Sequence, residues 1–191
     1  MSELPFVAGD VALDFVNTAE LRGDPLAGDA LRTPGDLVQW GRRYGLLASD
    51  ADDADDAELR KALQTRELLY RLFAAHVNGK PPADADLAAL AAAVAAAHAA
   101  ARLVVRDDGR LRWAWDPTRP ATIRNTAAAA ATELLRGDRL DRLKQCPGEH
   151  CGWLFIDATK RGNRRWCSMS ECGQEAKTAR RRRRRAPSQR S

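Results

Sequence analysis

The sequence predicts a mainly α-helical protein with one β-hairpin, followed by a small four-cysteine zinc module of treble-clef or ribbon type and a basic C-terminal helix or tail. Three observations support this. Apolar residues recur at helical spacing over most of residues 1–140, an Asp-Gly turn separates two strand-like runs, and all four cysteines lie within residues 146–172. We expect a helical body at 1–140, the module at 141–180 and a disordered tail at 181–191.

Capping residues and apolar periodicity place the helices of the body. Thr33 is a typical N-cap, Gly45 a typical stop, and Asp84 the expected cap of an alanine-rich helix. The expected helices start at about residue 11 and span residues 34–45, 55–77, 84–102 and 118–135, with a partly helical linker at 139–145. The inward stripes of the last two helices are Leu87, Leu90 and Val94, and Ile123, Ala127, Ala130 and Leu134.

A hairpin is predicted where Leu103–Val105 and Leu111–Trp115 flank a turn at Asp107–Arg110. Because strand side chains alternate, Trp113 and Trp115 share one face. They either stack on nucleobases or seal the hairpin against the helices. We favour sealing, since an isolated two-stranded ribbon is only marginally stable.

The four cysteines form two Cys-x4-Cys pairs, which are Cys146 with Cys151 and Cys167 with Cys172. Two such turns can bring four thiolates around one ion in the tetrahedral shell that Zn²⁺ accepts. A catalytic zinc needs an open position, and four thiolates leave none. The sequence therefore predicts one structural Zn²⁺, with Trp153, Phe155 and Ile156 packed against the metal core.

Two alternatives remain at this site. Paired disulfides would need an oxidising compartment, and residues 1–10 have no basic segment followed by an apolar one that would direct export. His150 could replace one sulfur, but it adjoins Cys151 and adjacent residues seldom point at the same ion. We expect His150 to be an exposed residue of the turn.

Both parts of the chain resemble one bacterial family. Cys146–Asp157, Arg164–Met169 (RRWCSM) and Cys172-Gly173 are similar to the CGNR zinc finger, and Ala12–Thr18 (ALDFVNT) is similar to the ABATE domain that precedes it. The resemblance implies a nucleic-acid-binding regulator, since family members are described as candidate stress-induced transcription regulators. The eponymous Asn-Arg reads here Gln174-Glu175, which removes a basic residue.

Charge divides the chain into an acidic body and a basic end. Residues 142–191 hold fourteen Lys/Arg against four Asp/Glu, a balance of +10 that leaves −5 for residues 1–141. One localised cationic footprint favours a polyanionic partner. The candidate nucleic-acid contacts are Arg164, Arg165, Lys177, Arg180, Arg181, Arg182, Arg183, Arg184 and Arg185.

A second candidate site lies near the N-terminus. Asp14 and Asn17 would share one helix face, and with Arg22 they could line a ligand pocket. Alternatively, they hold the neighbouring loop. The sequence has no nucleophile–base pair and no phosphate-binding glycine loop, so we expect no enzymatic activity.

The sequence thus predicts a zinc-finger nucleic-acid-binding regulator, with DNA favoured over RNA, whose body senses a signal or forms a homo-oligomer. A zinc-stabilised module that binds an acidic protein is the alternative, and an enzyme with a pocket near Asp14 and Asn17 is the remote one. We expect a cytoplasmic protein that could associate with the nucleoid. Membrane insertion is not expected, because no apolar run approaches the roughly 20 residues of a membrane helix.

Overall fold

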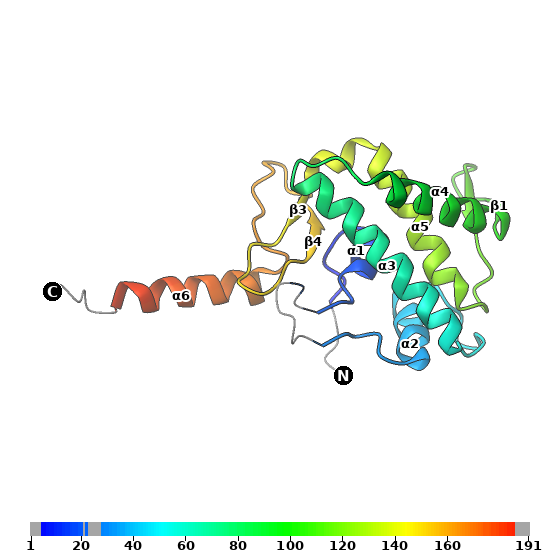
Figure 1. Ribbon diagram of the computed structural model, residues 1–191, viewed down its shortest axis with the longest axis horizontal. Helices are drawn as coiled ribbons and strands as arrows, with labels where there is room; N and C mark the ends of the chain where they lie inside the picture. The colour runs from blue at the N-terminus through cyan, green and yellow to red at the C-terminus, as the bar shows by residue number, and fades with distance from the viewer. Residues whose placement is uncertain (1–4, 21, 23–27, 186–191) are drawn as a thin grey trace.

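The computed structural model describes residues 5–20, 22 and 28–185, with side chains up to Arg182. Residues 186–191 of the expected tail lie outside this range. The body contains α1 (Val11–Val16), α2 (Pro34–Tyr44), α3 (Asp56–Val77), α4 (Asp84–Ala99) and α5 (Ala121–Arg136), as Figure 1 shows. The mainly helical fold class is confirmed.

Local signals set the ends of α2 and α3. Thr33 and Asp36 form a capping box at the start of α2, and Gly45 ends the helix in the left-handed conformation. Asp55 caps α3 by accepting from the Glu58 amide. These ends follow from residues within one turn of each boundary.

At α4 the expected cap is wrong. Asp84 is the first helical residue, and the cap position, Ala83, has no side chain that could accept a hydrogen bond. Two other ends differ from the sequence prediction, since α4 stops at Ala99 and α5 begins at Ala121. Leu87 of α4 is 46% exposed, although we expected it to face inward.

Helix α5 lies at the centre of the body and packs against α1, α3 and α4. Its Ile123, Ala127 and Leu134 are buried, whereas Ala131 replaces the expected Ala130 in the core. Helix α1 is enclosed, with every residue from Ala12 to Val16 buried. The body is therefore built around two helices that are covered by the others.

The predicted hairpin is present as antiparallel strands β1 (Arg102–Val105) and β2 (Leu111–Ala114). The Trp115 indole donates to the Ala97 carbonyl at 2.7 Å, and the Trp113 ring meets His98 edge-on at 4.9 Å. Both tryptophans therefore fix the hairpin to the end of α4, as the sealing interpretation expects.

The C-terminal part begins with a 3-10 turn (Asp138–Arg142) and a ribbon of β3 (Leu143–Gln145) and β4 (Leu154–Ile156). The expected helical character of the linker is therefore correct only up to Arg142. A π-helical turn (Met169–Gly173) then leads into α6 (Gln174–Arg185), which projects away from the rest of the chain in Figure 1. Residues 181–185 continue this helix, so the basic C-terminal helix of the predicted fold class extends into the segment that we assigned above to a tail.

One hydrophobic core runs through both parts of the chain. Leu154 and Phe155 on β4 are fully buried and belong to the same cluster as Phe15 of α1 and Phe73 of α3. Trp153, Phe155 and Ile156, which we expected to pack against the metal core, also extend the core of the body. Within the described ranges, no helix combines the length and apolar character required to cross a bilayer.

Candidate metal centre and basic surface

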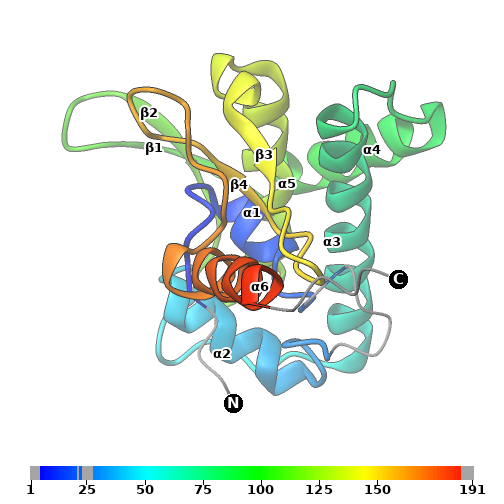
Figure 2. The ribbon, with the colours of Figure 1, turned by 90° about the vertical axis from the view of Figure 1, so that its left-hand side faces the viewer.

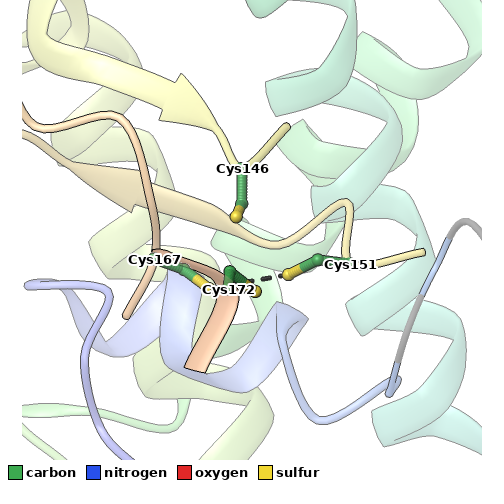
Figure 3. A group of neighbouring side chains, drawn as sticks. All are labelled: Cys146, Cys151, Cys167 and Cys172. Atoms are coloured by element: carbon green, nitrogen blue, oxygen red, sulfur yellow. Dashed lines mark hydrogen bonds between the residues drawn. The ribbon is translucent and has the colours of Figure 1, made fainter. Parts of the chain in front are cut away.

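The four cysteines converge on one point between the end of β3, the turn after it and the start of α6 (Figure 3). All four Sγ atoms lie within 4.8 Å of one another, with Cys151 to Cys167 at 3.5 Å and Cys167 to Cys172 at 3.7 Å. Zn–S bonds of about 2.3 Å in a tetrahedron separate the sulfurs by ~3.8 Å. The spacing therefore fits a single tetrahedral zinc ion.

The same distances exclude the disulfide alternative. A disulfide bond measures about 2.05 Å, and all four cysteines are free. Three of them are buried and Cys172 is half-buried, so the cluster is closed to substrate as a structural site requires. His150 is exposed and lies outside the cluster, as expected.

Backbone geometry forms the first turn around the metal position. Cys146 follows the ribbon strand, where its amide donates to the Trp153 carbonyl at 2.7 Å, and the Cys151 amide donates to the Gly148 carbonyl at 3.2 Å. A Cβ on Gly148 would lie 2.9 Å from the Cys151 Cβ and 3.2 Å from the Cys172 Sγ. Glycine at this position therefore lets the two pairs of cysteines approach each other.

Electrostatics within the cluster favour a bound cation. Thiol hydrogen bonds from Cys151 and Cys167 lower the pKa of Cys146 to about 2, whereas hydrogen bonding to Cys146 and Cys151, together with burial, raises the pKa of Cys167. Neighbouring thiolates repel one another in a buried volume, and a divalent cation removes this penalty. The donor set thus has the chemistry of a zinc site.

Comparison with known protein families agrees with this geometry. The ABATE family model, described as a "putative stress-induced transcription regulator", matches residues 9–138. The chain is a member of the ABATE family. The CGNR zinc finger model matches residues 142–185, so the four cysteines form the structural zinc site of a CGNR finger. A search of curated proteins finds no relative with significant similarity.

A side-chain clamp joins the ABATE helices to the finger. Asn17, at the end of α1, donates to the Leu154 carbonyl at 2.8 Å and accepts from the Leu154 amide at 3.0 Å. The side-chain amide of Asn17 thus makes the two backbone hydrogen bonds that a residue of a neighbouring strand would otherwise make with Leu154. The Ile156 amide donates to the Ala8 carbonyl at 2.8 Å and extends this pairing by one residue pair.

Asp14, the second residue of the candidate pocket, is also bound within the protein. It accepts from the Ala8 amide at 3.0 Å and from the Tyr44 hydroxyl at 3.2 Å. Burial raises the pKa of Asp14 to about 6, against the opposing effect of these hydrogen bonds. Its carboxylate therefore connects α1 to α2 and to the N-terminal segment.

Arg22, the third residue of the candidate pocket, has partners on two helices. It donates to Glu67 on α3 and to the Val16 carbonyl at the end of α1, and its guanidinium lies over the Tyr70 ring. These contacts, like the Asn17 clamp, connect elements of the fold. Asp14 and Asn17 bind the N-terminal segment, α2 and β4, so of the three residues only Arg22 fits the loop-holding alternative.

A partly buried ion pair organises the loop between the two cysteine pairs. Asp157 is fully buried and accepts from the Lys144 ammonium at 2.7 Å, the Thr159 amide at 3.0 Å and the Arg164 amide at 2.8 Å. Burial acts to raise the pKa of Asp157, but the hydrogen bonds from Lys144 and Thr159 lower it below its usual range. Asp157 therefore stays ionised and fixes the loop.

Arg164 has a different environment from the other candidate nucleic-acid contacts. Its guanidinium lies 4.4 Å from the centre of the Phe155 ring and donates to the carbonyls of Val7, Ile156, Trp166 and Cys167. The bond to Val7 holds the finger to the N-terminal segment, and the other three hold the loop within the finger. We therefore leave Arg164 out of the basic surface.

The remaining described candidates are all exposed. Arg165 projects from the loop before Cys167, and Lys177 and Arg180–Arg182 are exposed on α6. We call Arg165, Lys177, Arg180, Arg181 and Arg182 the basic surface. The backbone of α6 continues through Arg183–Arg185, whose side chains lie outside the described set. Because Cys172 lies two residues before α6, zinc fixes the start of this helix.

Proposed function

We propose that this ABATE protein is a nucleic-acid-binding transcription regulator, with DNA favoured over RNA, in which the zinc finger holds α6 as the cationic binding helix. The proposal rests on one observation. Helix α6 begins two residues after a zinc ligand, carries lysine and arginine on several sides, and extends away from the body toward the viewer in Figure 2. The helical body would sense a signal or provide dimerisation.

The physical basis of binding is phosphate neutralisation. The major groove of B-DNA admits an α-helix and is bordered by phosphates on both sides, so a helix with cations around its circumference suits it. Each neutralised phosphate releases counterions and contributes about −0.9 to the slope of log K against log salt. Arginine runs position a protein without distinguishing bases, so sequence readout requires other residues.

A groove beside α6 offers such residues. A cavity of about 460 Å³ lies between the first cysteine turn and α6, lined in part by Trp166, Glu175 and Arg180. The Trp166 ring is half-buried, and the Arg165 guanidinium lies 5.8 Å from the ring centre. A base edge or ribose entering here would meet an acceptor, a ring face and a cation.

The experiment that tests the proposal titrates a duplex DNA of about 20 base pairs, two helical turns, at several salt concentrations. The triple variant Arg180→Ala, Arg181→Ala, Arg182→Ala should bind more weakly, and its salt slope should be shallower by about 2.7 because three phosphate contacts are lost. The matched control Arg60→Ala, Lys61→Ala, Arg136→Ala removes the same charge from exposed positions on the body and should retain both affinity and slope. Equal losses in the two triple variants would refute the proposed interface.

Parallel titrations with RNA and with heparin separate the partner classes. Tighter binding to duplex DNA than to RNA or heparin supports the DNA assignment. Equal affinity for DNA and heparin would mean that electrostatic attraction alone accounts for binding. Chelation of zinc should abolish the difference, because α6 then loses its fixed start.

An acidic protein partner is the second candidate, and Glu175 is the observation that favours it. A glutamate in place of the family arginine weakens attraction to phosphate at the first turn of α6. The acidic run at residues 50–56 is an unsuitable internal partner, since Asp52 already pairs with Arg119 and Asp55 caps α3. Retention of a protein partner after nuclease treatment, without bound nucleic acid, would support this candidate.

A further inference from the structure

The four zinc ligands differ in their access to solvent. The three that are at most 5% exposed are Cys146, Cys151 and Cys167. Cys172 is half-buried and lines the groove between the first cysteine turn and α6. Gly148 lines the same groove, and a Cβ on Gly148 would lie 3.2 Å from the Cys172 Sγ. Because glycine has no Cβ, a small solute in the groove can approach this sulfur.

A second thiolate lies close to Cys172. The Sγ atoms of Cys167 and Cys172 are 3.7 Å apart, and a disulfide bond measures about 2.05 Å. Cys172 lies in the π-helical turn Met169–Gly173, which follows Cys167 directly along the chain. Cys151 is held more firmly, because its carbonyl accepts from the Arg22 amide at 2.9 Å. Cys167 is therefore the partner that Cys172 can reach within its own short loop.

From this arrangement we propose that Cys172 is an oxidation site, at which a hydroperoxide joins Cys172 to Cys167 and zinc is released. Cysteines that react with oxidants are partly exposed thiolates near positive charge, and Arg180 lines the groove beside Cys172. Glu149 and Glu175 line it as well, and four thiolates around Zn²⁺ leave a net negative charge. An uncharged oxidant such as hydrogen peroxide therefore enters more readily than an anionic one. This modification site goes beyond the proposed function and does not require nucleic-acid binding.

The oxidation consumes one molecule of hydrogen peroxide and takes two steps. In the first, the Cys172 thiolate attacks one peroxide oxygen, an S–O bond forms, the O–O bond breaks and hydroxide leaves, which gives a sulfenic acid. In the second, the Cys167 thiolate attacks the Cys172 sulfur, the S–S bond forms and a second hydroxide leaves. The two sulfurs lose two electrons, the peroxide oxygens gain them, and both hydroxides take protons from the buffer.

Loss of two ligands opens the closed metal site. The remaining thiolates, Cys146 and Cys151, do not complete the tetrahedral shell, so Zn²⁺ leaves to water. Cys172 lies two residues before α6, so the metal then no longer fixes the start of that helix. A dithiol reductant with added zinc should reverse the change by thiol–disulfide exchange, because Cys172 is accessible from the groove.

The test treats the reduced, zinc-loaded full chain with hydrogen peroxide and follows zinc release with a chromogenic chelator. Tryptic peptides 145–160 and 166–177 each contain one cysteine pair, so mass spectrometry separates the possible products. We expect release of one zinc ion per chain together with the loss of two hydrogens from peptide 166–177. At half-release, peptide 145–160 should still be reduced. A first disulfide within 145–160, or one that links the two peptides, would overturn the proposal.

Exchange of a ligand for histidine tests the role of Cys172 while keeping a fourth zinc ligand. Cys172→His should release zinc about tenfold more slowly than the wild type. The matched control Cys146→His changes a buried ligand and should release zinc at the wild-type rate. Met169→Leu removes an oxidisable side chain that is 70% exposed in the same turn, and it should also leave the rate unchanged. Equal rates in the two histidine variants would refute the role of Cys172, and if either variant fails to bind zinc, the peptide map of the wild type decides.

Discussion

Replacing Asn17 by alanine tests whether the helical body and the zinc finger are held together as the structure indicates. Asn17 is 4% exposed and makes two hydrogen bonds to Leu154, a residue with no exposed surface. The variant leaves the Leu154 amide and carbonyl buried without partners, at about 1–3 kcal/mol each. We expect the free energy of unfolding to fall by about 4 kcal/mol, a large share of the ~5–15 kcal/mol typical of a domain.

Urea unfolding at saturating zinc, followed by circular dichroism and tryptophan fluorescence, measures this loss. Asn78→Ala is the matched control, since Asn78 is exposed and its side chain donates a single hydrogen bond to the Ala74 carbonyl at the end of α3. It should lose no more than about 1 kcal/mol. If Asn17→Ala is destabilised no more than the control, the clamp contributes no measurable stability and the coupling between the two parts has another origin.

Zinc removal, pH, the finger loop and position 175 each provide a further test. Chelation of zinc should remove the near-UV contribution of Trp153 and Trp166 and lower the melting temperature, while far-UV circular dichroism retains most of the helix signal. Because the pKa of Asp14 rises from 3.8 to about 6 on folding, the folded state holds this proton to higher pH than the unfolded state does. The free energy of unfolding should therefore fall by up to about 3 kcal/mol between pH 4 and 6, and Asp14→Asn should lack this slope in urea titrations across that range. Lys144→Met removes the ammonium group that pairs with Asp157, so trypsin should cleave after Lys160 faster than in the wild type, as peptide mass spectrometry would detect. Glu175→Arg should strengthen DNA binding and steepen the salt slope by about 0.9, and an unchanged slope would place position 175 away from phosphate.

Local patterns in the sequence were sufficient to predict much of the fold. The N-cap at Thr33 and the left-handed stop at Gly45 depend on neighbouring residues only. The zinc ligands were also predictable, because two short Cys-x4-Cys turns specify a sulfur cluster without reference to the rest of the chain.

Long-range partners could not be predicted in this way. Asn17 contacts a residue 137 positions away, and a single sequence contains no signal for that distance. Polar residues within the apolar run of α1 did indicate a special role, but they could not distinguish a ligand pocket from a clamp. The sequence gives the charge of Arg164, which is the same as that of its basic neighbours. It does not give the backbone carbonyls that surround the guanidinium in the fold.

The shared core limits how this finger can be exchanged between proteins. A cassette cut between the two matched family segments would bring Leu154 and Phe155, both without exposed surface in the intact chain, into contact with water. The helices left behind would lose the apolar side chains that cover α1. Recombination that transplants the finger alone would thus produce two aggregation-prone fragments. The ABATE helices and the finger remain stable only when they are inherited together.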